Sequence, residues 1–327
     1  MLKRILNELI VNLTISPDGP VLIKSSSVGL GTDMAFVTTY RNNQKEVYLP
    51  GSSLKGVIRS HCEKICRTLQ RYSVCEPFDI KEKDITKENF PYLSCGFIFR
   101  KNEHWSKKNE GDHPYAHYKA SCPACRMFGS LNFKGRCFID DAYAQGEAPK
   151  PHIRDGVGID RFTGATKPGA KYDFEVITQG NFATQIRLTN FEMWQLELLC
   201  FALSDLCESN IRIGMASSRG LGKIKAKIES IEYQEIGKKP EFTGISDISL
   251  LEKDSSEKEL YGFDKPRVQS VPLSGTWESK GIRHGLKIHV EEFFKVASSI
   301  SGVLAGYLDR NPERNEIQKH YYNNGKI

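Results

Sequence analysis

Four cysteines between residues 72 and 126 have the residue type and spacing that a metal site requires. Cys122 and Cys125 form a C-x-x-C pair, and two thiolates this close can ligate one zinc ion tetrahedrally. Cys75 and Cys95 lie in the same stretch and are our choice for the remaining ligands. Three histidines of the stretch compete with them for one position: His104, His113 and His117. Because four cysteines leave no open coordination position, we expect structural rather than catalytic zinc.

The stretch 72–126 has no regular apolar spacing and no clear standard element, which favours the metal over its alternative. An insertion without such spacing lacks a core of its own, and metal binding supplies folding free energy directly. The alternative is a set of small buried thiols, which is our interpretation of Cys200 and Cys207. Nine cysteines cannot all form disulfides, and clustered cysteines in a chain without a secretion signal more often hold metal.

The segment "PGSSLKGVIRS" (residues 50–60) has the composition of a phosphate-binding turn. It leads into a helix, whose first N–H groups and dipole favour an anion. A glycine lets the backbone come close, hydroxyls donate, and two cations four residues apart share one face. The candidate contacts are Gly51, Ser52, Ser53, Lys55 and Arg59. The alternative is an ordinary helix start with a solvated Lys-Arg face.

A second loop, "GMASSRGLGKIK" (residues 214–225), is also basic and rich in glycine. Its glycines allow backbone N–H groups to line a concavity for phosphate. It lacks the Gly-Lys-Ser/Thr ending of a Walker loop and does not follow the dinucleotide pattern. The alternative is a tight turn into a strand. Two separate basic loops favour a polymer of phosphates over one small anion. The residues that matter here are Gly214, Ser218, Arg219, Gly220, Gly222, Lys223 and Lys225.

Bulk composition restricts the function little. The chain has 327 residues and a formal net charge of +6, which many proteins without a nucleic-acid partner match, so the local placement of charge must decide. No apolar run approaches the ~20 residues of a membrane helix. The first residues contain no long apolar region typical of a secretion signal, so we expect a cytoplasmic protein.

Apolar spacing predicts six elements once insertions are set aside. The order is strand, helix, strand, strand, helix, strand, which is the ferredoxin-like βαββαβ plan of RNA-recognition domains and an α+β fold. The first strand contains "LIVNLTI", and the first helix should bury the face of Ile58, Cys62, Ile65 and Leu69. The plan hosts many functions and specifies none by itself.

Finer expectations concern the ends of elements and the C-terminal part. Thr189 and Glu192 have the pattern of a capping box at the start of the second helix. Residues 149–170 should form an extended hairpin or loop, and residues 235 to about 270 a charged linker or long loop. A late helix near 290–308 should bury one face, formed by Phe293, Ala297, Ile300, Leu304 and Tyr307.

Three segments together make the sequence similar to the RAMP superfamily of CRISPR proteins. These are "LPGSSLKGVIRS", "CPACRMFGS" and "SSRGLGKIK". The middle motif and "DGVGIDRFTGATKPGAKYDFEVI" most resemble backbone subunits of type III effector complexes, which polymerise along the guide RNA. The resemblance covers roughly residues 5–232 and divides the chain into a domain of residues 1–234 and an extension of unknown role, 235–327.

The resemblance implies a modified RNA-recognition fold, subunits that stack along the guide, and a protruding "thumb" hairpin. The thumb displaces one nucleotide of the guide–target duplex at regular intervals, and it corresponds here to residues 149–171. Its cations suit phosphates and its apolar residues can wedge beside a base, since backbone contacts offset the cost of unstacking. The cations are Arg154, Arg161, Lys167 and Lys171, and the apolar residues are Ile153, Val157, Ile159 and Phe162. Related subunits also resemble this chain in carrying a zinc knuckle.

The resemblance also implies cleavage of single-stranded target RNA by an aspartate in the loop before the Pro-Gly-Ser-Ser motif. The matching residue is Asp33, in "GLGTDMAF". RNA can supply its own 2′-hydroxyl as nucleophile, so the protein needs to hold the backbone at one phosphate and supply a carboxylate, with Mg²⁺ or Mn²⁺.

Three competing functions remain at this point. The first is a purely structural backbone subunit with the same partners: guide RNA, target RNA and neighbouring subunits. The second is an endoribonuclease that processes the guide, which would need a general base such as His61 or His152. The third is an unrelated zinc protein without an RNA partner.

Overall fold

The computed structural model of the protein describes residues 4–25, 32–78, 84, 93–101, 114–263 and 267–310. These residues build a nine-stranded sheet with the strand order β14-β15-β11-β1-β10-β7-β3-β2, and β6 also pairs with β10. The bounds are β1 (Asn7–Pro17), β2 (Thr38–Arg41), β3 (Gln44–Leu49), β6 (Cys137–Ile139), β7 (Ala142–Ala144), β10 (Phe182–Thr189), β11 (Ile224–Ile236), β14 (Glu278–Lys280) and β15 (Arg283–Ile288). Every pair is antiparallel.

The centre of the sheet is β1, which pairs with β10 on one side and β11 on the other. Its alternation is the predicted one. Leu9, Val11, Leu13 and Ile15 are buried, and the residues that alternate with them are partly exposed: Ile10, Asn12, Thr14 and Ser16. One face of the sheet therefore carries the core and the other faces solvent, as an alternating antiparallel sheet allows.

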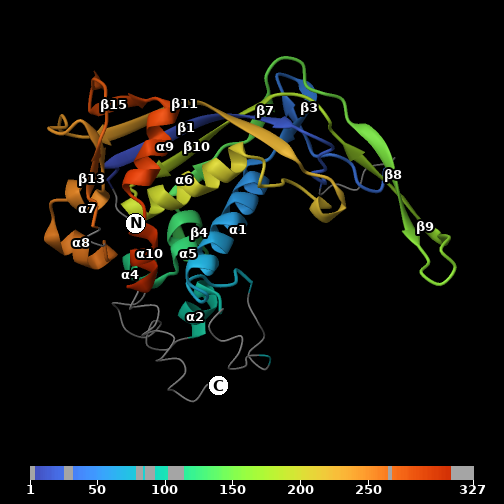
Figure 1. Ribbon diagram of the computed structural model, residues 1–327, viewed down its shortest axis with the longest axis horizontal. Coiled ribbons are helices and arrows are strands. Elements are labelled where there is room, and N and C mark those ends of the chain that lie inside the picture. The colour runs from blue at the N-terminus through green and yellow to red at the C-terminus, as the bar shows by residue number, and fades with distance from the viewer. Residues whose placement is uncertain are drawn as a thin grey trace.

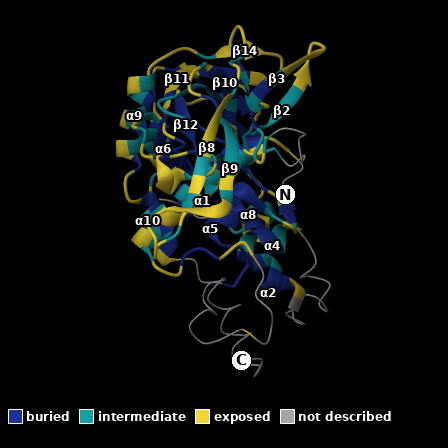
Figure 2. Cartoon of the chain, turned by 90° about the vertical axis from the view of Figure 1, so that its right-hand side faces the viewer, coloured by how far each residue is buried: buried dark blue, intermediate teal, exposed yellow. Residues whose placement is uncertain are grey.

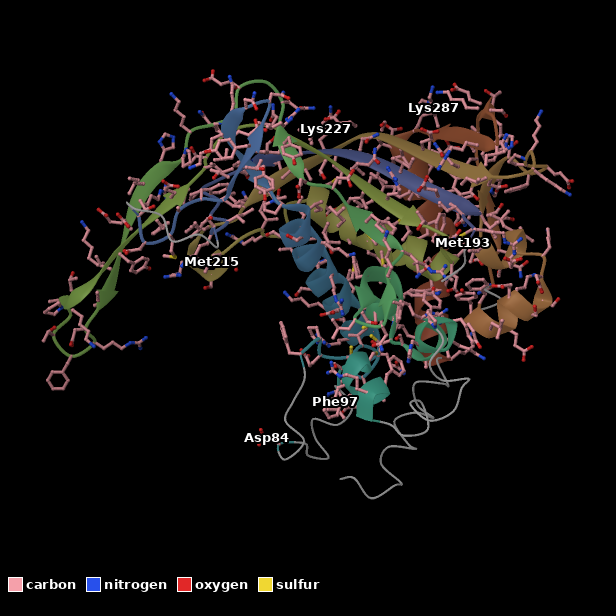
Figure 3. The ribbon with its side chains drawn as sticks, turned by 180° about the vertical axis from the view of Figure 1, so that it is seen from behind. Asp84, Phe97, Met193, Met215, Lys227 and Lys287 are labelled. Carbon is pink, nitrogen blue, oxygen red and sulfur yellow. The ribbon has the colours of Figure 1, made fainter. Side chains whose placement is uncertain are left out.

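The helices gather on the core side of the sheet (Figure 1). Their bounds are α1 (Gly51–Leu69), α2 (Cys95–Lys101), α4 (Pro114–Ala120), α5 (Pro123–Phe128), α6 (Met193–Cys207), α7 (Ile248–Leu251), α8 (Ser255–Tyr261), α9 (Val290–Ser299) and α10 (Val303–Asp309). In Figure 3, Lys227 and Lys287 project from the opposite side of the sheet, whereas Met193 lies among the helices. Sheet and helices together make this an α+β protein, as the sequence predicts.

Half of the predicted buried face of α1 is correct, since Ile58 and Cys62 are buried. Cys66 is buried, Ile65 is only partly buried and Leu69 is exposed. The core row runs through Leu54, Ile58, Cys62 and Cys66 at steps of four residues. The predicted face leaves this row after Cys62 by a step of three residues, and both steps are compatible with one face of a helix.

The capping box at the start of α6 lies three residues later than predicted. Glu192, not Thr189, is the N-cap, and its partner is Gln195. The Thr189 hydroxyl instead contacts the carbonyl of Arg136 at 3.4 Å, because Thr189 still belongs to β10. Propensity alone did not distinguish the end of that strand from the start of the helix.

A long hairpin, β8 (His152–Ile159) and β9 (Thr166–Val176), projects from the body of the molecule (Figure 1). The predicted extended hairpin therefore exists, but it is longer than the predicted range 149–170, because its second strand continues to Val176. Most hairpin residues are exposed (Figure 2). Only the base of β9 is buried, at Val176.

The segment after residue 235 is a packed part of the structure, so the predicted linker is wrong. It forms β12 (Gly244–Ser246), α7, α8 and β13 (Ser270–Pro272). The side chain of Asn7 in β1 donates to the carbonyls of Phe191 and Ser246 at 3.2 and 2.9 Å, which attaches this segment to the first strand.

The predicted late helix is two helices, α9 and α10. Gly302, with φ of 85°, separates them in the left-handed region that favours glycine. Most of the predicted face is correct, since Phe293, Ile300, Leu304 and Tyr307 are buried against the core.

Candidate functional site

The four predicted cysteines meet in one buried cluster. The sulfur atoms of Cys75, Cys95, Cys122 and Cys125 all lie within 4.8 Å of one another. Cys75 lies 3.6 Å from both Cys122 and Cys125. Four thiolates around zinc at about 2.3 Å would be about 3.8 Å apart, so this donor set fits a tetrahedral metal such as zinc.

Local structure brings the cluster together. Cys122 is the N-cap of α5, and Pro123 occupies the first turn, where its missing N–H costs nothing. The residues 72–126 thus contain helices α2, α4 and α5 rather than being irregular throughout. Among the competing histidines, His117 is buried against the ring of Phe99 at 4.6 Å, while His104 and His113 lie outside the described residues.

The electrostatics of the cluster favour a thiolate at one position. Burial opposes ionisation of Cys122, but hydrogen bonds from Cys125 and Cys75 outweigh it and lower the pKa of Cys122 to about 7. The guanidinium of Arg59 lies 3.5 Å from the sulfur of Cys125 and also donates to Glu63 and to the carbonyl of Gly129. Arg59 therefore supplies positive charge beside sulfurs that must be deprotonated to bind metal.

A cleft of about 570 Å³ opens beside the cluster and is lined by Lys55, Arg59 and Lys134. The ammonium groups of Lys55 and Lys134 lie 6.0 and 4.7 Å from the ring centre of Phe138. Burial, together with the cations Arg59 and Lys134, lowers the pKa of Lys55, although Cys137 opposes this. Lys134 is not among the predicted contacts. It lies in the short hairpin of β4 (Gly129–Ser130) and β5 (Phe133–Lys134), and folding brings it to the cleft that Lys55 lines.

The start of α1 packs closely against the rest of the fold. Gly51 is buried, and its N–H donates to the Asp141 carboxylate at 2.6 Å. A Cβ on Gly51 would lie 2.4 Å from the carbonyl oxygen of Ile139, so packing alone requires a glycine here. Ser52 is exposed and Ser53 partly exposed, and neither caps the helix, whose N-cap is Pro50.

The second glycine loop lies beside the base of the hairpin. It contains a single 3-10 turn, Ser217–Arg219, in which Ser218 and Arg219 are exposed. Arg219 donates to the hydroxyl of Tyr172 in β9 at 2.7 Å. Lys223 and Lys225 both approach Asp18, at 2.7 and 3.5 Å. Positive φ and close backbone contacts account for two glycines, Gly214 and Gly222, while Gly220 is left-handed in open space.

Asp33 is exposed and lies on the same hairpin base. Its N–H donates to Oδ1 of Asp173 at 2.8 Å, and the N–H of Asp173 donates to Oδ2 of Asp33 at 3.1 Å. The next residues continue this contact, because Glu175 N–H donates to the carbonyl of Met34 at 3.0 Å. Tyr172 and Asp173 are consecutive in β9, so Arg219 and Asp33 contact neighbouring residues of one strand.

The tip of the hairpin holds an aromatic ring out in solvent. The carboxylate of Asp160 accepts the N–H groups of Phe162 and Thr163 at 2.8 and 3.1 Å, and these bonds lower the pKa of Asp160. Phe162 is fully exposed, at 101 %. Ile153, Val157 and Ile159 are also exposed, as are the cations Arg154, Arg161, Lys167 and Lys171. Lys171 pairs with Asp155 at 3.4 Å.

The two candidate histidines are in different settings. Nε2 of His61 contacts Oδ2 of Asp205 at 2.6 Å, which joins α1 to α6. His152 is exposed at the start of β8.

These features define a class: an α+β protein with a buried four-cysteine cluster, a basic cleft beside it and a projecting hairpin that exposes both charged and apolar side chains. The family model described as RAMP superfamily matches residues 18–225, which is more than half of the chain. The chain belongs to the RAMP superfamily. Membership points to a CRISPR-associated, RNA-binding function. The comparison with curated proteins gave no match. Within the described residues, no helix has the length and apolar character needed to span a bilayer.

Proposed function

We propose that this protein is a backbone subunit of a type III CRISPR effector complex, which binds guide RNA, single-stranded target RNA and neighbouring subunits. The strand order β11-β1-β10 with β6 beside β10, covered on one side by α1 and α6, supports a ferredoxin-like core. This is the plan that RNA-recognition domains share.

The observation that carries the proposal is the projecting hairpin. The hairpin exposes several apolar side chains to water, and a group of exposed apolar side chains can mark the surface where a partner binds. A ring such as Phe162 can insert beside a base, while Arg154 and Arg161 contact phosphates. The hairpin then serves as the thumb that displaces one nucleotide of the guide–target duplex.

Two basic surfaces would hold the ribose-phosphate chain. One is the cleft of Lys55 and Lys134, where two ammonium groups share one aromatic ring. The other is the exposed loop with Ser218 and Arg219 beside the hairpin base. Separate cationic sites of this kind position a polyanion without reading its sequence.

For cleavage, Asp33 supplies a carboxylate beside the hairpin that would distort the target strand. Asp173 brings a second carboxylate next to it, and Mg²⁺ binds through one or two carboxylates together with substrate phosphates. The two residues therefore fit a divalent ion, Mg²⁺ or Mn²⁺, which would stabilise charge on the scissile phosphate. Asp33 would hold the RNA strand in position, so that a 2′-hydroxyl of the RNA can attack the adjacent phosphate.

A non-catalytic structural subunit is the main alternative, and it shares every feature except the role of Asp33. Guide processing is less well supported. His61 contacts Asp205 between α1 and α6 and does not line the basic cleft, and His152 is exposed at the start of the hairpin, where no carboxylate of the described residues is bonded to its ring to orient it.

The test is copurification of the protein from cells that carry its complex, followed by sequencing of bound RNA. Guides with a shared terminal tag are expected. In the assembled complex, Phe162→Ala should weaken engagement of target RNA, while Ile282→Ala, which removes an exposed apolar side chain of the β14–β15 turn, should not. Bound RNA without guide sequences, or equal effects of the two variants, would contradict the proposal.

A further inference from the structure

The sulfur atoms of the cysteine cluster accept hydrogen bonds from the N–H groups around them. Cys95 accepts the main-chain N–H of Cys122 at 3.3 Å, and Cys122 accepts that of Cys125 at 3.5 Å. The sulfur of Cys125 accepts instead from a side chain, the guanidinium of Arg59, at 3.5 Å. Donors of this kind fix the orientation of a metal ligand and offset the negative charge that four thiolates bring to one divalent ion. Arg59 thus supplies at Cys125 what the main chain supplies at the other two sulfurs.

Two further bonds hold the guanidinium of Arg59 in this position. Its Nε donates to the buried carboxylate of Glu63 at 2.9 Å, one turn along α1, and a terminal nitrogen donates to the carbonyl of Gly129 at 3.0 Å. Gly129 is the C-cap of α5, the helix whose first turn contains Cys125. All three nitrogen atoms of the guanidinium therefore have a partner, and the planar fork of an arginine suits contacts in three directions.

A second arginine of α1 holds another segment of the cluster. Arg67 lies farther along the helix, donates to the main-chain carbonyl of Cys75 at 3.1 Å and pairs with Glu76 at 2.9 Å. Unlike Arg59, it contacts a carbonyl and a carboxylate rather than a sulfur. Through these two arginines, α1 is attached to two of the segments that supply cysteines, so the helix helps to shape the metal site.

Three cations line the adjoining cleft, and they differ in what they contact. Lys55 and Lys134 lie near the ring of Phe138, and among the described residues neither ammonium group has an ion-pair partner. Their charges are available to a ligand in the cleft. Arg59 lines the same cleft, but its guanidinium contacts Glu63 and a cysteine sulfur. The sequence places Arg59 with Lys55 among the candidate phosphate contacts, whereas the structure gives the two residues different partners.

We propose that Arg59 is a positioning residue of the metal centre rather than a contact for RNA phosphate. It orients the sulfur of Cys125, offsets part of the negative charge of the four thiolates and ties α5 to α1. Phosphates of RNA in the cleft then meet Lys55 and Lys134. The first part of this role rests on metal binding by the four cysteines, and the second rests on the proposed binding of RNA in the cleft.

Zinc affinity of the full chain, measured by competition with a chromophoric chelator, tests the first part. Arg59→Ala and Arg59→Lys should each weaken zinc binding about tenfold or more, because loss of an outer-shell partner typically costs this much. Lysine keeps a positive charge beside the buried Glu63, so Arg59→Lys should keep its melting temperature at saturating zinc. Lys64→Ala, which removes an exposed lysine of the same helix, should leave the zinc affinity unchanged.

Absorbance of the cobalt-substituted protein separates a sulfur contact from a general effect on the fold. Loss of an N–H donor raises the energy of the sulfur electrons, so the thiolate-to-cobalt band should move to longer wavelength in Arg59→Ala. Arg67→Ala loses a contact with a carbonyl and none with a sulfur, so its band should stay in place. Equal zinc affinity in the two Arg59 variants and in Lys64→Ala, or an unmoved band in Arg59→Ala, overturns the proposal. An unaltered protein that binds no metal overturns it together with the metal site.

Binding of single-stranded RNA at several salt concentrations, with saturating zinc, tests the second part. Arg59→Ala should leave the slope of the salt dependence unchanged, whereas Lys55→Ala should lower the slope by about 0.7 for the lost phosphate contact. A loss of slope in Arg59→Ala equal to that in Lys55→Ala would assign Arg59 to RNA and overturn the proposal. An unchanged slope in Lys55→Ala would instead contradict RNA binding in the cleft, while the metal measurements still decide the role of Arg59.

Discussion

Asp33 and Asp173 hold each other through two reciprocal hydrogen bonds, each from a backbone N–H to the other residue's carboxylate. The residues are 140 positions apart in sequence. The pair attaches the loop that carries the candidate catalytic carboxylate to the base of the hairpin. Any movement of the hairpin on RNA would therefore move Asp33 with it.

The first prediction separates a catalytic residue from a positioning residue. In an assembled complex, Asp33→Ala should lower the rate of target RNA cleavage by about a hundredfold or more, because the reacting carboxylate is lost. Asp173→Ala should lower it by about tenfold through misplacement of Asp33. Asp173→Asn keeps a carbonyl oxygen for the Asp33 N–H but removes the second carboxylate of the proposed metal site. It should therefore retain more activity than Asp173→Ala and require a higher Mg²⁺ concentration.

Single-turnover cleavage with matched guide occupancy makes the measurement. If Asp33→Ala cuts at the unaltered rate and positions, the subunit is structural and not catalytic. If Asp173→Ala and Asp173→Asn lose equal activity, the hydrogen bond to Asp33 is not the reason for the loss.

The second prediction concerns zinc. Protein purified without chelators should contain about one zinc per chain, and Cys122→Ser should lose the metal and melt at lower temperature, since metal binding supplies folding free energy. Cys200→Ser, which changes a buried thiol of α6 that is not part of the cluster, should keep its zinc. Zinc affinity should fall as pH falls, because the thiols must lose protons to bind. Metal analysis that finds no zinc in the unaltered protein rules the site out.

The third prediction distinguishes packing from phosphate binding at the start of α1. Gly51→Ala should lower the free energy of unfolding by about 1–3 kcal/mol, since its Cβ would overlap the Ile139 carbonyl. Gly56→Ala, five residues along the same helix and facing open space, should raise it by up to about 1 kcal/mol. Urea denaturation measures both. A Gly51→Ala protein of normal stability that binds RNA poorly would instead assign this glycine to the phosphate.

Sequence reasoning succeeded where residue type and spacing leave few choices. Cys75, Cys95, Cys122 and Cys125 were identified because few side chains ligate soft metals, and β1 because its alternation is regular. It failed where distant residues decide. The segment around Ile245 and Ile248 has the composition of a linker, because charged residues surround its few apolar ones. Asn7, which holds this segment through the carbonyl of Ser246, is more than two hundred positions away. Lys134 was missed because only folding brings it to Lys55.

The fourth prediction concerns the buried pair that joins the C-terminal helices to the rest of the fold. Arg126 contacts Glu192 at 2.8 Å and the hydroxyl of Tyr307 at 2.6 Å, and all three are buried. The ring of Tyr307 is stacked on Trp194 at 4.2 Å. Arg126→Ala should cost about 3–5 kcal/mol, because the buried Glu192 carboxylate loses its ion-pair partner.

A double-mutant cycle isolates the interaction. Arg126→Met with Glu192→Met should be less destabilising than the sum of the single changes, since neither residue is then left without its ion-pair partner. Tyr307→Phe should cost about 1 kcal/mol and leave a single unfolding transition. Additive effects of the two methionine changes, or a separate transition for the C-terminal part, would show that the pair does not join the two regions.

The last prediction is a pH dependence that originates at Asp247, the N-cap of α7. Its carboxylate accepts the N–H groups of Ser249 and Met193, but burial and the neighbouring carboxylate of Glu192 raise the pKa of Asp247 to about 7. In the unfolded chain an aspartate titrates near about 3.9. Between these values the folded protein holds a proton that the unfolded chain releases. The contribution of Asp247 to stability is therefore greatest at low pH and is lost as pH rises toward 7.

Urea denaturation of the unaltered protein and of Asp247→Asn, at several pH values, isolates the contribution of Asp247 to the free energy of unfolding. The free energy of unfolding of the unaltered protein, minus that of the variant, should fall by about 2–3 kcal/mol between pH 5 and pH 8. Asparagine retains an acceptor for Ser249 but cannot titrate, so it serves as the reference at every pH. A difference that stays constant or rises across this range would mean that Asp247 is already ionised in the folded protein, and that α7 is held by a charged cap rather than a protonated one.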